Sequence, residues 1–354
     1  MRIGFVRRGH SATGGAEAYM LRLAAALNAA GEETLLVTSP DWPAERWPFG
    51  DIIRLPARTP VEFAAAFQNA RTGCDTHFSL ERVPGCGVYR AGDGVHAAWM
   101  RRRDQFEPLW KRATRWMNPK HSQILKLERE VFDASNTRVV IANSRMIRDE
   151  ICEHFAFPVE RIEVVYNGIS LPGTLPAREE ARRRLGVAPG IFCVLFLGTG
   201  WERKGLRTAL QAVEMVEGAE LLVAGRGPAD FYRSDKARFL GPVTDIAALF
   251  AAADILALPT WYDPFSNACL EGLAAGLPVI TTDANGVSEI LEPGVHGDVV
   301  PAGDALALAG AIEAWMAPGR CVAARPACLR LAAEFSIERN ARETLRILRD
   351  VEKA

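Results

Sequence analysis

The chain has 354 residues, of which 49% are hydrophobic and 24% are charged, with a formal net charge of −1. This composition is typical of a globular protein, the length is enough for two domains, and the near-neutral charge gives no sign of a nucleic-acid partner. The seven cysteines include no C-x-x-C pair, which disfavours a zinc site or a disulfide framework and favours the reducing cytoplasm.

The first 38 residues are predicted to form a strand, a loop, a helix and a second strand. Residues 3–6 are a short apolar run, and 7–15 read as loop. From Ala16, apolar residues recur at helical spacing until Gly31, and residues 34–38 form the next apolar run. A strand, a helix and a strand in this order predict a parallel sheet covered by helices.

Further units of this kind follow, in two series. Residues 164–180 contain two glycines and two prolines and are the predicted domain boundary. The second series is expected to have strands at 191–198, 219–225, 237–241, 254–259 and 278–282. The sequence therefore predicts an α/β protein with two Rossmann-like, doubly wound domains facing a cleft. Ligands of such sheets bind beyond the carboxyl ends of the strands, so the loops after the strands are the candidate sites.

The first candidate loop carries Gly14 and Gly15 just before a predicted helix. Backbone N–H groups without side chains, together with the positive end of a helix dipole, suit a phosphate. The spacing is not G-x-G-x-x-G, which disfavours a nicotinamide cofactor. An ordinary pair of loop glycines is the alternative.

Two more loops follow the first two strands of the second series. Arg203 and Lys204 are adjacent cations that could bind a phosphate, although such a pair is more often solvated surface. Gly225 and Gly227 would leave room for a flat base beside the backbone.

The fourth loop, residues 261–271, places two carboxylates where a strand gives way to a helix. Carboxylates accept two hydroxyl groups at once, so Asp263 and Glu271 suit the diols of ribose or a sugar ring. N–H groups near Ser266, Asn267 and Ala268 begin the helix and can bind an anion. The alternative is that Asp263 caps the helix and Glu271 faces solvent.

These four loops, in this order, resemble the retaining glycosyltransferases of the GT-B fold, in glycosyltransferase family four. Asp263 and Glu271 match the E-x7-E motif of that family, with Asp in the first place. The RKG at 203–205 is similar to that of the lipopolysaccharide-core glucosyltransferases. The resemblance implies an acceptor-side domain at 1–170, a nucleotide-sugar-binding domain at 171–335, and a helix at 336–354 that returns to the first domain.

Roles carried over from the family fall on matching positions. Glu271 would hold the donor ribose, Asp263 the transferred sugar, and Lys204 a phosphate. The arginine that the family has five places before Lys204 corresponds to Thr199, and Arg203 is expected to replace it. The resemblance also places several residues near the sugar or the donor: His96 with Asp93 behind it, Gly14, Gly15, Gly225, Gly227, Val243, Phe265, Ser266, Asn267 and Ala268.

The resemblance implies transfer of a hexose from a nucleoside diphosphate sugar, a UDP-sugar by preference, to a glycan or glycolipid such as lipopolysaccharide core. No D-x-D motif occurs, so neither a metal nor another cofactor is expected. Two alternatives stay open. A nucleotide-sugar 2-epimerase would bind the same donor, and the departures at Asp263 and Thr199 would suit a non-catalytic nucleotide-sugar-binding protein.

Residues 99–121 carry seven Lys or Arg against two acids, interleaved with three Trp and one Phe. This composition is typical of a peripheral contact with an anionic membrane, which would place the protein at the cytoplasmic face of the inner membrane. The expected contacts are Trp99, Arg101, Arg102, Arg103, Trp110, Lys111, Arg112, Arg115 and Trp116. An ordinary amphipathic helix packed on the first domain is the alternative, and no nucleic-acid motif is present. No apolar run is long enough for a signal peptide or a membrane span.

Overall fold

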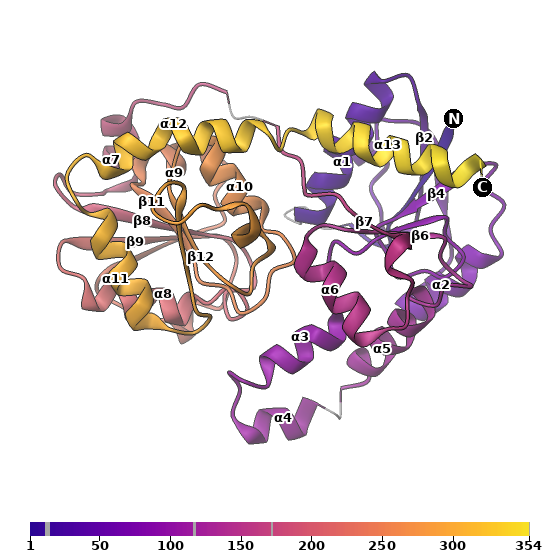
Figure 1. Cartoon of the computed structure of the whole chain (residues 1–354), viewed down its shortest axis with the longest axis horizontal. Coiled ribbons are helices and arrows are strands. Elements are labelled where there is room, and N and C mark those ends of the chain that lie inside the picture. The colour runs from indigo at the N-terminus through magenta and orange to yellow at the C-terminus, as the bar shows by residue number, and fades with distance from the viewer. Residues whose placement is uncertain (11–14, 116–117, 171–172, 354) are drawn as a thin grey trace. The chain divides into compact units, whose positions relative to one another are not determined.

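The computed structural model describes residues 1–10, 15–115, 118–170 and 173–353. The chain divides into two compact units (Figure 1). Unit 1 comprises Met1–Gly168 and Ile337–Ala354, and unit 2 comprises Ile169–Ser336. Each unit is built on one parallel sheet with helices packed on it, so the expected fold class is confirmed.

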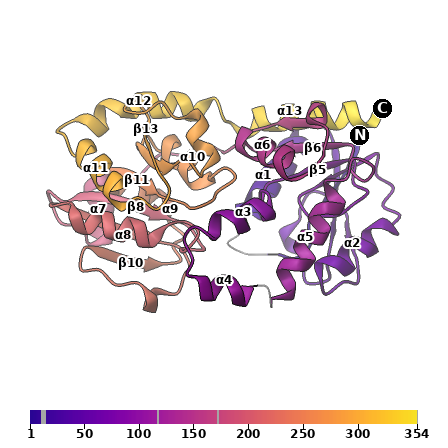
Figure 2. The same cartoon turned by 60° about the horizontal axis from the view of Figure 1, so that its bottom comes forward.

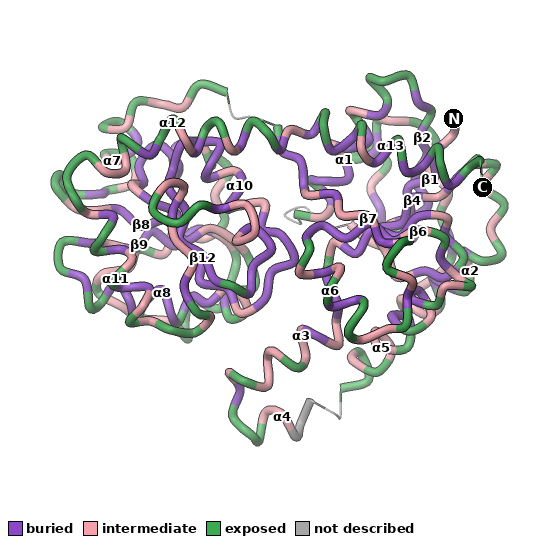
Figure 3. The backbone as a smooth tube through the Cα atoms, viewed as in Figure 1, coloured by how far each residue is buried: buried purple, intermediate pink, exposed green. Residues whose placement is uncertain are grey.

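The sheet of unit 1 has the strand order β3-β2-β1-β4-β5-β6-β7. Its strands are β1 (Arg2–Val6), β2 (Glu33–Thr38), β3 (Ile52–Arg54), β4 (Thr76–Ser79), β5 (Val88–Arg90), β6 (Val139–Ala142) and β7 (Ile162–Val164). The order reverses between β1 and β4, where Ile3 lies opposite Thr76. The central strands are apolar and buried along most of their length, because helices cover the sheet (Figure 3).

The helices of unit 1 include the last helix of the chain. They are α1 (Gly15–Ala29), α2 (Pro60–Gln68), α3 (His96–Arg103), α4 (Leu109–Arg115), α5 (Pro119–Val131), α6 (Arg145–His154) and α13 (Ile337–Lys353), with short 3₁₀ turns at Ala44–Arg46 and Val159–Arg161. Leu345 and Leu348 of α13 share one apolar core with Leu23 of α1. The Tyr19 hydroxyl donates to Asn340 Oδ1 at 2.8 Å. The C-terminal helix is therefore part of the core of unit 1.

The sheet of unit 2 has the order β10-β9-β8-β11-β12-β13. Its strands are β8 (Phe192–Leu197), β9 (Ala219–Ala224), β10 (Ala237–Gly241), β11 (Ile255–Leu258), β12 (Val279–Thr282) and β13 (Gly297–Val300). Its helices are α7 (Arg178–Leu185), α8 (Leu206–Met215), α9 (Ile246–Ala252), α10 (Asn267–Ala274), α11 (Ala305–Trp315) and α12 (Arg320–Ala333), with 3₁₀ turns at Ala229–Phe231 and Gly286–Ile290. The strand order reverses between β8 and β11, which makes this pair the switch point of the sheet.

Two glycines allow the loop after β8 to come into backbone contact with the loops after its neighbours β11 and β9. Gly205 has φ +78°, and a Cβ there would lie 1.8 Å from the carbonyl oxygen of Pro259. Gly225 has φ +122°, and a Cβ there would lie 1.9 Å from the carbonyl oxygen of Gly198. Each of these two positions therefore requires glycine. Residues with a side chain disfavour a positive φ, and the neighbouring carbonyl group leaves no space for a Cβ.

Substitution of Gly205 by Ala is expected to destabilise unit 2. The left-handed backbone alone costs about 1–2 kcal/mol for a residue with a Cβ, and the overlap with Pro259 adds to it. Gly310→Ala is the matched control, because Gly310 is exposed in the middle of α11 and an added Cβ would meet nothing within 4 Å. That change should stabilise by about 0.5–1 kcal/mol. Urea denaturation of both variants measures the difference, and equal midpoints would contradict it.

Candidate functional site

In unit 2, a cation and a carboxylate meet across the switch point. Lys204, in the loop after β8, forms an ion pair through Nζ with Asp263 Oδ2, in the loop after β11. Both side chains are largely buried, with exposed fractions of 12% and 8%. Arg203 lies beside the pair, because its Nη1 donates to the carbonyl oxygen of Tyr262 at 3.0 Å. The structure thus brings together three of the residues that the sequence selected.

Backbone hydrogen bonds hold the two loops against each other. The carbonyl oxygen of Arg203 accepts from the amide of Trp261 at 2.8 Å and from Thr260 Oγ1 at 2.9 Å. Thr282, the last residue of β12, donates through Oγ1 to the carbonyl oxygen of Thr260 at 2.6 Å. These bonds join the ends of β8, β11 and β12, so Arg203 and Lys204 have a fixed base.

The loop that carries Asp263 leads directly into α10, which begins four residues later at Asn267. Ser266 is its N-cap residue and makes no side-chain capping bond to the helix. Asp263 is engaged with Lys204, so the alternative in which Asp263 caps α10 is not what the structure shows. Asn267 and Glu271 follow on α10 and are half-buried, whereas Phe265 is buried. The first N–H groups of α10 carry the positive end of the helix dipole, and they follow Asp263 closely in the chain.

The glycines after β9 have a clear packing role. A Cβ at Gly227 would overlap the indole of Trp201, whose Nε1 donates to the carbonyl oxygen of Gly198 at 3.1 Å. The positions that a Cβ would take at Gly225 and Gly227 are therefore occupied by Gly198 and Trp201. Thr199 is exposed in the loop after β8, and Val243 is half-buried after β10.

In unit 1, acids surround an arginine at the corresponding switch point. Arg7, just after β1, pairs with Glu17 at 3.0 Å, with Asp93 at 3.6 Å and with Glu81 at 3.8 Å. Burial alone would lower the pKa of Arg7, but the three carboxylates outweigh it and raise the pKa. Asp93 is the most exposed of these acids.

His96 begins α3 and forms a pair with a second histidine. Its Nε2 lies 3.0 Å from Nδ1 of His121 on α5, and the two rings stack. Burial, with smaller effects of Arg82, His121 and Arg103, lowers the pKa of His96 to about 4. His96 is therefore neutral at pH 7 and can take part in hydrogen bonds without carrying a charge.

A buried carboxylate fixes the start of α3. Glu128 of α5 accepts from the amide of His96 at 2.7 Å and from the amide of Ala97 at 3.0 Å. Arg82 donates through Nε to the same carboxylate at 3.2 Å. No local pattern in the sequence marks Glu128 or His121, because both act on His96 from a separate helix. Gly15 is exposed at the start of α1, and Gly14 lies outside the described residues.

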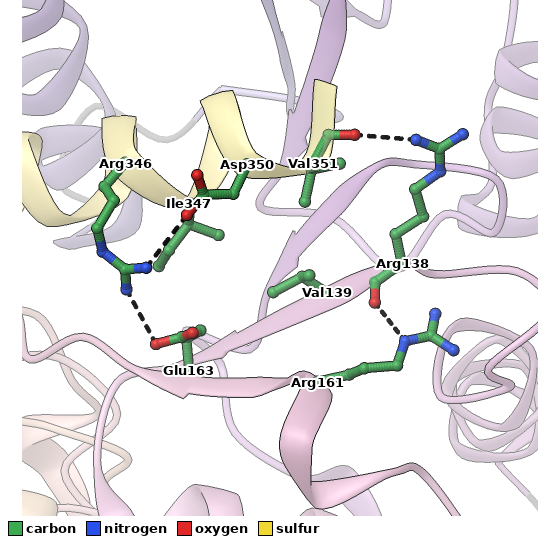
Figure 4. A pocket seen from close by; sticks show the side chains of 8 residues that line it. All are labelled: Arg138, Val139, Arg161, Glu163, Arg346, Ile347, Asp350 and Val351. Carbon is green, nitrogen blue, oxygen red and sulfur yellow. Dashed lines mark hydrogen bonds and ion pairs between the residues drawn. The ribbon is translucent and has the colours of Figure 1, made fainter. Parts of the chain in front are cut away.

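A cavity of about 400 Å³ in unit 1 lies away from these loops (Figure 4). It is lined by residues at or just before the starts of β6 and β7, and by α13. Arg138 donates to the carbonyl oxygen of Val351 at 2.9 Å, and Arg346 pairs with Glu163 at 3.1 Å. The cavity is at the amino ends of the strands, where α/β sheets do not place their ligands, and its arginines tie α13 to the sheet.

The basic, aromatic segment 99–121 forms α3, α4 and the start of α5. In Figures 1 and 2, α4 extends away from the sheet of unit 1. Leu109 and Trp110 are 76% and 66% exposed. Ion pairs join Arg101 to Glu153, Arg102 to Glu150, Arg103 to Glu107 and Arg112 to Asp104. The segment therefore presents exposed apolar side chains beside arginines that are already paired.

Other aromatic and basic residues of that segment lie close to one another. Trp99 is half-buried under Arg103, and Lys111 stands 5.8 Å from the ring centroid of Trp110. Trp116 and the side chain of Arg115 lie outside the described residues. No helix in the described part of the chain is long and apolar enough to cross a membrane.

Two parallel, doubly wound sheets with a return of the last helix define the class of GT-B glycosyltransferase folds. The crystal structure of WaaG, a glycosyltransferase involved in lipopolysaccharide biosynthesis, matches 98% of this chain and 99% of its own, with a TM-score of 0.81 and 20% identity. HepE of Anabaena in complex with UDP-glucose matches 98% of this chain and 99% of its own, with a TM-score of 0.77 and 20% identity. At these identities the likeness establishes the fold.

Sequence families extend this assignment. Residues 192–317 match the family described as Glycosyl transferases group 1, and residues 89–171 match Glycosyltransferase Family 4. Two parts of the chain therefore match glycosyltransferase family models, as the loops predicted.

Curated relatives match over part of their length. An uncharacterised glycosyltransferase of Methanocaldococcus jannaschii is 30% identical over 177 residues, 45% of either chain. The D-inositol 3-phosphate glycosyltransferase of Pseudarthrobacter chlorophenolicus is 31% identical over 195 residues, 49% of this chain and 46% of its own. The match therefore spans about half the length of these relatives.

Removal of one member of the Lys204–Asp263 pair is expected to leave the other charge buried. Lys204→Met or Asp263→Asn alone should each destabilise unit 2 by about 3–5 kcal/mol. The double variant should lose clearly less than the sum, because it leaves no buried charge. Denaturant unfolding of the four proteins measures the coupling.

Arg346→Met provides the control for this cycle. Arg346 and Glu163 are 57% and 42% exposed, so loss of their ion pair should cost less than about 1 kcal/mol. Additive losses in the Lys204–Asp263 cycle, within about 0.5 kcal/mol, would show that the pair is not coupled.

Proposed function

We propose that the protein transfers a hexose from a UDP-sugar to a glycan or glycolipid acceptor, with retention of configuration and without a metal or other cofactor. The observation that carries this proposal is the Lys204–Asp263 pair at the switch point of unit 2, with Arg203 beside it. The family matches and the fold shared with HepE in its complex with UDP-glucose support the same donor class.

Each group has a role that its chemistry suits. Negative charge grows on the diphosphate as its bond to the sugar breaks, and Lys204, Arg203 and the amide groups at the start of α10 would stabilise that charge. A single preorganised donor of this kind is worth about 2.7–4 kcal/mol in other enzymes. Asp263 would accept hydroxyl groups of the transferred sugar, and Glu271 those of the ribose.

The acceptor side rests on unit 1. Neutral His96 would hydrogen-bond to the sugar, and Asp93, the most exposed of the acids around Arg7, would accept an adjacent hydroxyl. No side chain is assigned as a nucleophile, because retention by attack on the same face of the sugar requires none. An acceptor of the lipopolysaccharide-core type is in keeping with the fold that the chain shares with WaaG.

The protein is further proposed to work at the cytoplasmic face of the inner membrane. Exposed Leu109 and Trp110 on α4 would enter the headgroup region, with Lys111 near anionic lipid. The arginines of α3 would contribute only after exchanging their partners, since Arg101, Arg102 and Arg103 are paired within unit 1.

Incubation with a panel of UDP-sugars tests the activity. Without an acceptor, the protein should hydrolyse the UDP-sugar slowly and release UDP. With a suitable acceptor, it should transfer the sugar with retained anomeric configuration. Both reactions should proceed in excess EDTA. NMR of the products follows the configuration and also detects any epimer of the donor. Loss of activity in EDTA that a divalent metal restores would contradict the metal-independent mechanism, and an epimerised donor would indicate an isomerase.

Glu271→Ala serves as the site control for that experiment. UDP affinity should fall about 10- to 150-fold, because a hydrogen bond to a charged acceptor is worth about 1.5–3 kcal/mol. Unchanged UDP affinity in a folded variant would assign Glu271 to the structure of α10 instead.

Co-sedimentation with vesicles tests the membrane contact. Leu109→Ser with Trp110→Ser should abolish pelleting with vesicles of anionic lipid, because these two side chains supply the exposed apolar surface of α4. Arg101→Ser should have a smaller effect, since Arg101 is paired with Glu153. Salt should weaken the wild-type contact, because exposed charges are screened beyond about 8 Å at physiological ionic strength. Equal pelleting of all three proteins would refute the contact.

A further inference from the structure

The loop after β12 contains a buried amide that holds the loop carrying Asp263. Asn285 is 0% exposed, so its side chain is enclosed by protein. Its Oδ1 accepts the backbone amides of Ser266 and Val287, both at 3.2 Å. Its Nδ2 donates to Thr281 Oγ1 at 2.9 Å and lies 3.6 Å from Cys269 Sγ. Both lone pairs of the oxygen and both hydrogens of the amide therefore have partners.

The backbone on either side of Asn285 holds Asp263 as well. The amide of Asp263 donates to the carbonyl oxygen of Ala284 at 2.9 Å, and the amide of Gly286 donates to the carbonyl oxygen of Asp263 at 3.0 Å. Asp263 and Asn285 thus form an isolated parallel bridge. The carboxylate of Asp263 is directed to Lys204, so its main chain is held by one loop and its side chain by another.

A relay connects this amide to the sheet. Thr281 Oγ1, which accepts from Asn285, donates in turn to the carbonyl oxygen of Leu258 at 2.9 Å. Leu258 is the last residue of β11, and the loop with Asp263 leaves from it. Asn285 therefore joins both ends of that loop, at Leu258 through Thr281 and at Ser266 directly.

We propose that Asn285 is a positioning residue for sugar transfer. Its side chain holds the amide of Ser266, and its neighbours Ala284 and Gly286 hold the backbone of Asp263. This turn thereby sets where the Asp263 carboxylate and the start of α10 meet the transferred sugar and the phosphate. Asn285 touches neither donor nor acceptor. This inference rests on the proposed function and extends it to a residue outside the motifs found in the sequence.

Three substitutions separate the bonds of Asn285. Asn285→Asp keeps an oxygen for the amides of Ser266 and Val287 but cannot donate to Thr281. Asn285→Ser keeps the short turn, because a serine oxygen can accept from the amide two residues on, but it cannot reach Ser266. Asn285→Ala loses every side-chain bond. Because the Asp and Ser variants both lose the bond to Thr281, the difference between them isolates the bond to Ser266.

We expect turnover to fall most in the variants that lose the bond to Ser266. With a UDP-sugar, kcat should fall about tenfold or more in the Ser and Ala variants and less in the Asp variant. Affinity for UMP, which lacks the sugar and the second phosphate, should stay unchanged within about threefold in all of them. If Asn285 had only a structural role, UMP affinity and turnover would fall together. Both would then fall most in the variant with the lowest melting temperature.

Thr137→Val is the matched control for lost stability. Thr137 is buried in unit 1 and donates to the carbonyl oxygen of Val131 at 2.7 Å, next to the amino end of β6. The Thr137→Val variant should have a lower melting temperature and an unchanged kcat. An active wild type with an equally active Ser variant would overturn the positioning role alone. A wild type that neither binds nor turns over any UDP-sugar would overturn the proposed function and this inference together.

Discussion

The ion pair between Lys204 and Asp263 depends on the strand order of the second sheet. From β8 the chain continues toward β9, and from β11 it continues toward β12, so the loops after these neighbouring strands leave in opposite directions. A position between them is open to side chains from both loops. Lys204 and Asp263 occupy it, and the hydrogen bonds of Thr260 and Thr282 keep the loops in register there.

A buried ion pair is a weak source of stability. Taking both charges out of water costs several kcal/mol each, and a well-packed apolar pair would often be as stable or more so. The molecule nevertheless surrounds this pair with a dense set of backbone bonds and with two glycines that allow close approach. Such concentration of fixed polar groups where a simple apolar contact would serve is typical of a functional site.

Much of this arrangement could be predicted from the sequence, because it depends on local patterns. Apolar runs identified the strands. Adjacent cations after one strand selected Arg203 and Lys204, and carboxylates between a strand and a helix selected Asp263. Other features depend on partners distant in the chain. Asn285 follows a strand whose loop was not among the candidate sites, His121 reaches His96 from another helix, and Trp201 packs against Gly227. Tertiary packing decides these contacts, and no local pattern marks them.

The two sheets use the same switch-point geometry with opposite balances of charge. At the β8–β11 switch, Arg203 and Lys204 outnumber Asp263, which favours an anionic ligand. At the β1–β4 switch, three carboxylates surround Arg7: Glu17, Glu81 and Asp93. This excess of acidic groups disfavours an anionic ligand and suits hydroxyl groups. The proposed reaction, between a diphosphate sugar and a hydroxyl-bearing acceptor, would use one edge of each kind. The same strand order, repeated with different loop residues, therefore gives the two sheets edges that differ in their balance of charge.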